Sequence, residues 1–223
     1  MRLWMVWMAA AALLIAQEKE WSLREGIVIE HKGEPLAIKR QIDPACEKGA
    51  MSFTPDTLWG GEWASELAPE ECKKSFITTF GKVTPMRFHP KVQTVGEVEV
   101  VEFIRDHYKD PAFALVDSRM EMWYEQMTIP TAVSVSFLHV SEPEQFGDKH
   151  DAALAKLGVT RKGGKYDFSK AKTALFFCNG AWCAQSTIMM GWLIKQGYPP
   201  EKMLWYRDGL QGWLQYDLTV VEP

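Results

Sequence analysis

The sequence lacks the features by which nucleic-acid-binding proteins and zinc proteins are usually recognised. It has no basic run, and 25 Lys and Arg against 29 Asp and Glu give a formal net charge of −4. Because a phosphate backbone is bound mainly through clustered basic residues, nucleic acid is excluded as the main partner. There is no Cys-x-x-Cys motif, and the five histidines are scattered without paired spacing. We therefore expect no metal and no other cofactor.

An apolar run long enough to cross a membrane as a helix is also missing at the N-terminus. Residues 3–16 carry no charge, but these 14 residues fall short of the ~20 that a membrane-spanning helix needs. Arg2 before the run and Ala16 at its end make residues 1–16 typical of a secretory signal peptide. We expect export, most simply to a bacterial periplasm. The alternative is an uncleaved anchor, which would be the protein's one membrane contact.

Cysteine is scarce, with four residues in the chain, and export would place them in an oxidising compartment. Cys46 and Cys72 lie among polar and turn-forming residues, where we predict a disulfide that staples a loop. Such a bridge contributes ~3.5 kcal/mol in the chain-entropy model. Cys178 and Cys183 lie in a different setting, treated below.

The composition divides the chain near residue 92. Residues 17–91 are dense in Pro, Gly and Trp, which predicts a small irregular extension with short strands and a helix near 68–76. From 92 to 223, short apolar runs alternate with helical patterns, which predicts an α/β fold whose parallel sheet is covered on both faces. Strands are expected at Phe113–Asp117, Ala132–Phe137, Thr173–Phe177 and Met203–Tyr206, and helices at 95–108, 186–196 and 209–216. Residues 141–172 form an insertion, with a helix at 149–157 and a turn at 163–164.

The strongest functional signal is the segment from Cys178 to Ser186. Cys178 directly follows the apolar run Thr173–Phe177, at the strand end where α/β sheets bind ligands. Main-chain N–H groups of the next loop can turn inward, and the helix near Ser186 adds its positive end. Both favour a Cys178 thiolate and an anion attached to it. A buried, inert cysteine ending a strand is the structural alternative. The residues expected to surround the anion are Asn179, Gly180, Ala181, Trp182, Cys183, Ala184, Gln185 and Ser186.

Four motifs, in order, resemble those of the rhodanese domain. They are Leu115–Arg119, similar to a strand ending in Asp-x-Arg; Ile129–Val135, similar to the His-Ile-Pro-Gly-Ala segment; Cys178–Ser186 with Leu193–Tyr198 after it; and Trp205–Trp213, similar to the closing Gly-Gly-x-x-x-Trp. The resemblance covers about residues 92–223. It implies a five-stranded parallel sheet flanked by helices, with Cys178 accepting sulfur and carrying it as a persulfide.

Departures from the family pattern bear on the activity. The loop from Cys178 to Ser186 contains no Arg or Lys, and Cys183 stands where the family normally has a basic residue. This weakens the expectation of efficient thiosulfate cleavage. Ala184 stands where the phosphatase branch of the fold needs an Arg, which argues against that activity. The family's His before Ile-Pro is Thr128 here.

Three charged residues outside the loop belong to the expected site or its frame. Asp117 and Arg119 are expected to tie the sheet end to neighbouring loops rather than to act on substrate. Arg207 follows the last strand and is the one cation expected at the rim.

Three functions remain open from the sequence. The first is an exported sulfurtransferase that takes sulfur from a small anion and passes it to a thiol acceptor. The second is a thiol–disulfide redox protein that uses Cys178 and Cys183 as a pair. The third is a non-catalytic binding module that recruits a protein partner through residues 17–91. In either catalytic case we expect Cys178 to have the lower pKa and Cys183 to face outward or sideways.

Overall fold

The computed structural model describes residues 27–31, 33–38, 44, 70–73 and 81–223. The expected signal segment and Cys46 lie outside these residues, so export and the Cys46–Cys72 disulfide stay predictions. Within the described ranges, no helix is both long and apolar enough to cross a bilayer. Nor does any group of three or more His, Cys, Asp and Glu in those ranges form a candidate metal site.

A five-stranded parallel sheet forms the centre of residues 92–223, in the order β3-β9-β8-β4-β5. The strands are β3 (Gln93–Val95), β4 (Phe113–Asp117), β5 (Val133–Ser134), β8 (Thr173–Phe177) and β9 (Met203–Tyr206). Asp117 of β4 pairs with Phe177 of β8, which in turn pairs with Tyr206 of β9. Three strands therefore end side by side at the carboxyl edge of the sheet.

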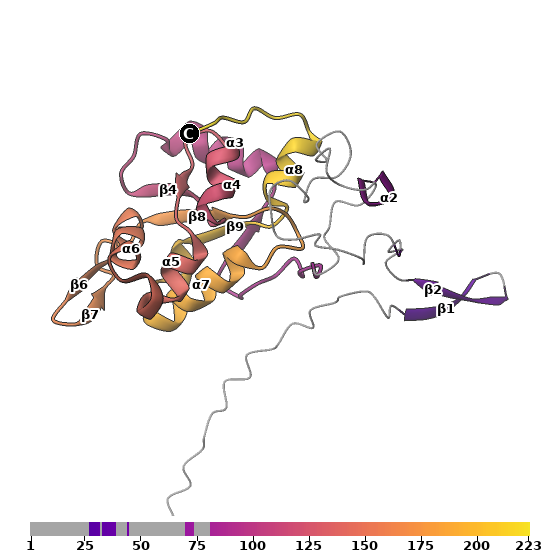
Figure 1. Ribbon diagram of the computed structural model, residues 1–223, viewed down its shortest axis with the longest axis horizontal. Coiled ribbons are helices and arrows are strands. Elements are labelled where there is room, and N and C mark those ends of the chain that lie inside the picture. The colour runs from indigo at the N-terminus through magenta and orange to yellow at the C-terminus, as the bar shows by residue number, and fades with distance from the viewer. Residues whose placement is uncertain (1–26, 32, 39–43, 45–69, 74–80) are drawn as a thin grey trace, which may run out of the picture.

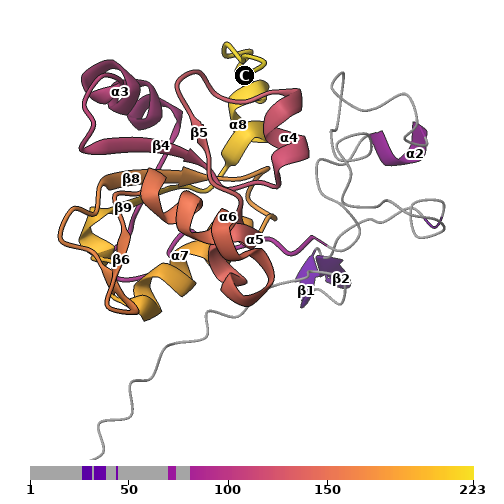
Figure 2. The same cartoon turned by 60° about the vertical axis from the view of Figure 1, so that its left-hand side comes forward.

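Helices cover both faces of this sheet, as Figures 1 and 2 show. One layer contains α3 (Glu97–His107), α4 (Glu121–Gln126) and α8 (Gly209–Gln215). The opposite layer contains α5 (Phe137–Ser141), α6 (Pro143–Lys156) and α7 (Gln185–Gln196). A short 3-10 helix, η3 (Pro200–Lys202), leads into β9.

Alternating side chains of the central strands divide the core into two clusters. Leu115, Leu175 and Phe177 pack with Val100, Trp123, Leu210 and Trp213. Val116, Ala174 and Phe176 pack with Leu154, Met189 and Leu193 on the other face. Because both faces of β4 and β8 are buried, their sequences read as continuous apolar runs.

The predicted α/β fold is confirmed, and three of its strands have the predicted bounds, namely β4, β8 and β9. The strand expected over Ala132–Phe137 is wrong in extent, because pairing with β4 is limited to Val133 and Ser134 and Phe137 already begins α5. The helix expected at 149–157 corresponds to the second part of α6, because Gly147 has non-helical backbone angles (φ +42°, ψ −111°) and divides this element into two helices. The first part was not expected, and Pro143 suits its first turn. Strand β3 and helix α4 were not located from the sequence.

Smaller elements complete the described chain. The insertion ends in the hairpin β6 (Thr160–Lys162) and β7 (Lys165–Asp167), with Gly163 and Gly164 at positive φ in its turn. In the extension, β1 (Ile27–His31) pairs antiparallel with β2 (Glu34–Ile38), and α2 spans Glu70–Lys73. Helix α2 lies within the helix expected at 68–76, and the other residues of that range lie outside the described ones.

Candidate active site

Cys178 is the first residue after β8, and its side chain is buried with 1% exposed. The loop that follows reaches α7 at Gln185. The beginning of α8 holds this loop from the other side, because the N–H of Leu210 donates to the carbonyl of Cys178 and the N–H of Gln211 donates to that of Asn179, both at 2.9 Å. The cysteine is therefore fixed between two helix starts.

Gly209 makes this close approach of loop and helix possible. Its φ is +57°, and a Cβ atom at this position would lie 2.3 Å from the carbonyl oxygen of Cys178 and 2.8 Å from the nitrogen of Gly180. Both contacts are with backbone, which cannot rotate away. Any side chain at 209 would push the loop away from α8.

Hydrogen bonds favour the thiolate form of Cys178. Burial alone raises the pKa of this thiol, but donors from Cys183, the Ser186 hydroxyl and the N–H groups of Ser186 and Gly180 lower it, and the net result is a pKa of about 7. The predicted inward-facing N–H groups are therefore those of Gly180 and Ser186. At neutral pH about half of such a thiol is ionised.

One contact of Cys178 favours the protonated thiol instead of the thiolate. The Cys178 thiol can donate to the carbonyl oxygen of Cys183, which lies 3.1 Å from its sulfur. This bond is available only to the protonated form, so ionisation must give it up. We regard the donors as the larger influence, because several of them converge on a sulfur that faces this one carbonyl.

Cys183 is buried as well, with 4% exposed, so of the two expected orientations, outward or sideways, the outward one is wrong. Its sulfur accepts a hydrogen bond from Asn179 Nδ2 at 3.9 Å. Burial raises the pKa of Cys183 well above its ordinary value, and the neighbouring Cys178 raises it further through hydrogen bonding and charge. The two thiols therefore differ in the predicted direction, with Cys178 the more acidic.

A hydrogen bond between Trp182 and Gln211 joins the cysteine loop to α8. The Trp182 side chain is 7% exposed, and its Nε1 donates to Oε1 of Gln211 at 2.6 Å. Gly180 lies against this pair, since a Cβ there would be 2.7 Å from the Gln211 oxygen. Trp182, expected among the residues around the anion, thus binds a side chain of α8.

Thr84 contacts the same loop from a distant part of the chain. Its N–H and hydroxyl both donate to the carbonyl of Ala181, at 2.8 and 2.5 Å. Arg207 Nε and Nη2 donate to the carbonyl of Thr84 at 2.9 and 2.7 Å, and Nη1 binds Asp208. The expected rim cation is thus bound to the segment that precedes the sheet.

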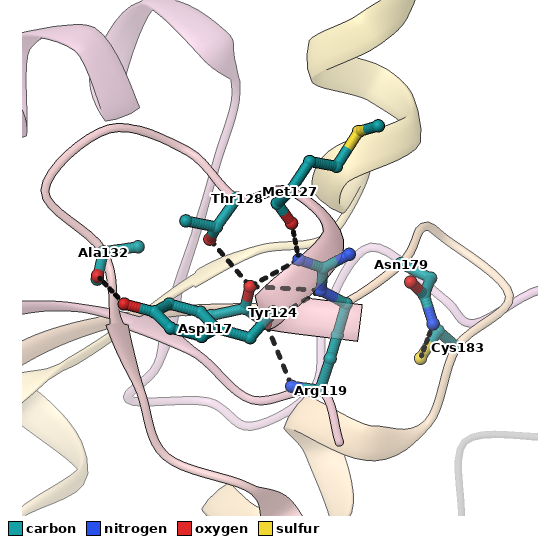
Figure 3. Close-up of polar contacts among 8 residues, drawn as sticks. All are labelled: Asp117, Arg119, Tyr124, Met127, Thr128, Ala132, Asn179 and Cys183. Carbon is teal, nitrogen blue, oxygen red and sulfur yellow. Dashed lines mark hydrogen bonds and ion pairs between the residues drawn. The ribbon is translucent and has the colours of Figure 1, made fainter. Parts of the chain in front are cut away.

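Asp117 and Arg119 form a buried ion pair at the end of β4, as Figure 3 shows. Arg119 Nη2 lies 2.6 Å from Asp117 Oδ2 and also donates to the carbonyl of Met127 at 2.5 Å. Thr128, in the place of the family's His, donates to Asp117 Oδ2 at 2.8 Å. The pair therefore joins β4 to residues 127–128, as the structural interpretation expects.

The Arg119 guanidinium also has a nitrogen that takes no part in the ion pair with Asp117. Arg119 Nη1 is buried and has no hydrogen-bond partner among the described residues. In Figure 3 this nitrogen lies on the side of Arg119 that faces Asn179. The N–H of Ser118 donates to the carbonyl of Phe177, which brings the Arg119 backbone next to the start of the cysteine loop.

The loop residues predicted from the sequence therefore differ in what they contact: some contact Cys178 or Cys183, and the others bind residues outside this pair. Gly180, Cys183 and Ser186 contact the Cys178 sulfur, and Asn179 and Gln185 donate to Cys183. Ala181 and Trp182 bind Thr84 and Gln211 instead, and Ala184 accepts from the Thr187 hydroxyl. Thr84 and Gln211 were missed. Gln211 lies within a quoted motif, whereas no sequence signal marked Thr84.

The pocket found among the described residues lies away from the cysteine loop. A pocket of about 240 Å³ opens at the amino ends of the strands, lined among others by His107, Phe113 and Lys172. Cys178 lies at the opposite, carboxyl edge of the sheet. The pocket contains no cysteine, so the candidate chemistry remains at the loop.

Comparison with known proteins agrees with this geometry. Residues 100–216, just over half of the chain, match the family model described as Rhodanese-like domain. No curated protein matches the sequence.

Solved structures with similarity to this chain include three from bacteria. The BH2092 protein of Bacillus halodurans is 19% identical over 59% of this chain and 77% of its own, with a TM-score of 0.41. A thiosulfate sulfurtransferase of Pseudomonas aeruginosa is 20% identical over 59% of this chain and 20% of its own, with a TM-score of 0.35. A polysulfide-sulfur transferase of Wolinella succinogenes is 11% identical over 61% of this chain and 82% of its own, with a TM-score of 0.38.

Proposed function

The chain belongs to the rhodanese-like domain family, and on that basis we propose that it is a sulfurtransferase that carries sulfane sulfur as a persulfide on Cys178. One observation supports the proposal above the others. The Cys178 thiol is buried, yet the hydroxyl of Ser186 and the N–H groups of Ser186 and Gly180 help to lower its pKa to about 7. An inert binding module has no need of such a thiol.

The proposed loading step begins with the Cys178 thiolate. It attacks the terminal sulfur of a polysulfide, and a new S–S bond forms at Cys178 while the donor's S–S bond breaks. The electron pair of that bond leaves with the shortened polysulfide dianion, and the outer sulfur of the persulfide carries one negative charge. Gly180 and Ser186 are placed to donate to the entering sulfur, which is the contribution expected of a helix start and an inward-facing loop.

The sulfur donor is proposed from the charges around the loop. No Arg or Lys lies between Cys178 and Ser186, and the guanidinium of Arg207 is bound to Thr84 and Asp208. A sulfonate group, as in thiosulfate, would find few cationic donors here. Polysulfides and small persulfides lack that group, so we propose them as the better donors, with a thiol as the final acceptor.

Intact-mass spectrometry of the reduced protein tests this proposal. After brief exposure to polysulfide, the wild type should gain the mass of one sulfur atom, and dithiothreitol should remove it. Thiosulfate at the same concentration should load more slowly. Cys178→Ser should gain nothing under either condition. A gain that persists in Cys178→Ser, or no gain in any chain that keeps Cys178, would contradict the assignment.

Export belongs to the same proposal. The N-terminal sequence predicts a signal peptide ending at Ala16 and delivery to a bacterial periplasm. Expression in a Gram-negative host followed by N-terminal sequencing of the periplasmic fraction tests this. A protein found only in the cytoplasm with Met1 intact would contradict it. A protein partner bound through residues 17–91 is proposed only as an accessory to transfer.

A further inference from the structure

We propose that Cys183 is an internal sulfur acceptor, which attacks the Cys178 persulfide and releases its outer sulfur as hydrosulfide. This inference rests on the proposed persulfide at Cys178 and adds the fate of that sulfur. In the absence of an external thiol acceptor, the products would be sulfide and a Cys178–Cys183 disulfide.

Contact between the two cysteines is the first observation behind this inference. The Cys183 thiol donates a hydrogen bond to the Cys178 sulfur, and that sulfur also lies 3.1 Å from the Cys183 carbonyl oxygen. Both cysteines are free, on a loop fastened between β8 and α7. The two cysteines are therefore in contact within one short loop.

Burial is the second observation. Cys178 is 1% exposed, and Trp182 in the same loop is 7% exposed. An external thiol must open the loop to reach the inner sulfur of a persulfide. Cys183 is already inside, so attack by this thiol is intramolecular and has the advantage of proximity.

The third observation is how charge changes on loading. In the resting site burial raises the pKa of Cys183 most and the Cys178 thiolate raises it further, so Cys183 is protonated. Once Cys178 carries an outer sulfur, the negative charge moves to that sulfur and the inner sulfur becomes a neutral electrophile. The N–H groups of Asn179 and Gln185, which donate to Cys183, then favour its ionisation.

The proposed step balances without a further reagent. The Cys183 sulfur forms a bond to the Cys178 sulfur, and the bond between the inner and outer sulfur of the persulfide breaks. The outer sulfur leaves with the electron pair and takes the proton of Cys183, so that hydrosulfide is the product. Sulfane sulfur is reduced to sulfide, and the two thiols are oxidised to the disulfide. A dithiol reductant then restores both thiols by exchange.

A single-turnover experiment tests the inference with the full-length protein under anaerobic conditions. Reduced protein is loaded with polysulfide and desalted rapidly, and free sulfide and intact mass are followed over time. The wild type should release one sulfide per chain while its mass falls to that of the unloaded protein less two hydrogens. Peptide mapping should locate the new disulfide at Cys178–Cys183. The rate should not depend on protein concentration.

Cys183→Ser and Cys183→Ala are the deciding variants. Both should gain one sulfur on Cys178 and hold it, with sulfide release slowed roughly tenfold or more until an external thiol is added. If they release sulfide as fast as the wild type, or if the wild type keeps its persulfide as they do, the internal acceptor is wrong while the persulfide stands. If no chain gains sulfur, the proposed function fails, and this inference fails with it. Using two substitutions guards against one of them failing to fold.

Discussion

At the scale of single residues, Ser186 is a main support of the Cys178 thiolate. Its hydroxyl is buried and lies near enough to the cysteine sulfur to lower the pKa of Cys178. The same residue contributes its main-chain N–H. Removal of the hydroxyl leaves the N–H in place, so the thiolate loses part of its stabilisation but not all of it.

Alkylation as a function of pH checks this directly. The rate at Cys178 should rise as the pH increases through about 7, because only the thiolate reacts and the pKa is lowered to that value. Ser186→Ala should move the midpoint to higher pH, since a donor to the charged form is lost. The matched control is Ser118→Ala, whose buried hydroxyl is not among the donors to Cys178 and should leave the midpoint unchanged. Equal midpoints in all three chains would contradict the role of Ser186.

Thr131 carries local strain. It is a β-branched residue with φ of +70°, a conformation that favours glycine, and it stands where the resembled motif has Gly. Thr131→Gly should raise the free energy of unfolding by roughly 0.5–1 kcal/mol. Relief of the backbone strain at positive φ contributes ~1–2 kcal/mol, which exceeds the entropic cost of ordering a glycine. Denaturant titration measures this. Thr131→Ala keeps the unfavourable φ and should gain nothing, so equal stability of the Gly and Ala variants would contradict the explanation.

At the scale of elements, the approach of α8 to the cysteine loop depends on Gly209. Gly209→Ala should lower the free energy of unfolding by roughly 2–4 kcal/mol, because a Cβ would meet backbone atoms at a positive φ. The same substitution should slow persulfide loading, since the loop must move. Both effects can be measured on one preparation by denaturant titration and intact mass.

Gly191 in α7 provides the matched control. A Cβ there would meet only Phe88, at an ordinary contact distance of 3.8 Å. Gly191→Ala should therefore stabilise the protein by about 0.5–1 kcal/mol through helix propensity. If both glycine substitutions had the same effect, the close approach at Gly209 would not be the cause.

At the scale of the whole molecule, Thr84 links the segment before the sheet to the cysteine loop. Thr84→Val keeps the N–H bond to Ala181 but removes the hydroxyl bond. Losing a bond worth about 1 kcal/mol should make loop opening about fivefold more frequent, so a bulky alkylating reagent should reach Cys178 faster at every pH. Ser141→Ala, which removes a similar bond within α5, should leave the rate unchanged. An unchanged rate in Thr84→Val would show that the segment does not restrain the loop.

The extension supplies a second prediction at this scale. Cys72 is buried in α2, while its predicted partner Cys46 lies outside the described residues. We expect a Cys46–Cys72 disulfide in the exported protein, identified by peptide mapping without reduction. Its reduction should destabilise residues 17–91 before the sheet, by up to ~3.5 kcal/mol. Alkylation of both cysteines in unreduced, unfolded protein would contradict the pairing.

Sequence alone was sufficient for the strands buried on both faces and for the position of Cys178. Runs such as Thr173–Phe177 are apolar throughout because both faces are covered, so they can be recognised without knowing what covers them. Cys178 was found because its place after such a run is a local property of the chain. The same reasoning failed for β3, whose three residues are too few to show a pattern.

Only the tertiary structure decided what surrounds Cys178. Thr84 and Ala181 are 97 positions apart, and Trp182 and Gln211 are 29 apart, so neither contact has a local signature. Cys183 was expected to face outward or sideways from its place in the loop, but it is buried in a loop that α8 and Thr84 both contact. Local patterns determine which residues form elements and where a nucleophile can stand. The burial, hydrogen bonds and pKa of that nucleophile depend on distant segments, which come together only when the chain folds.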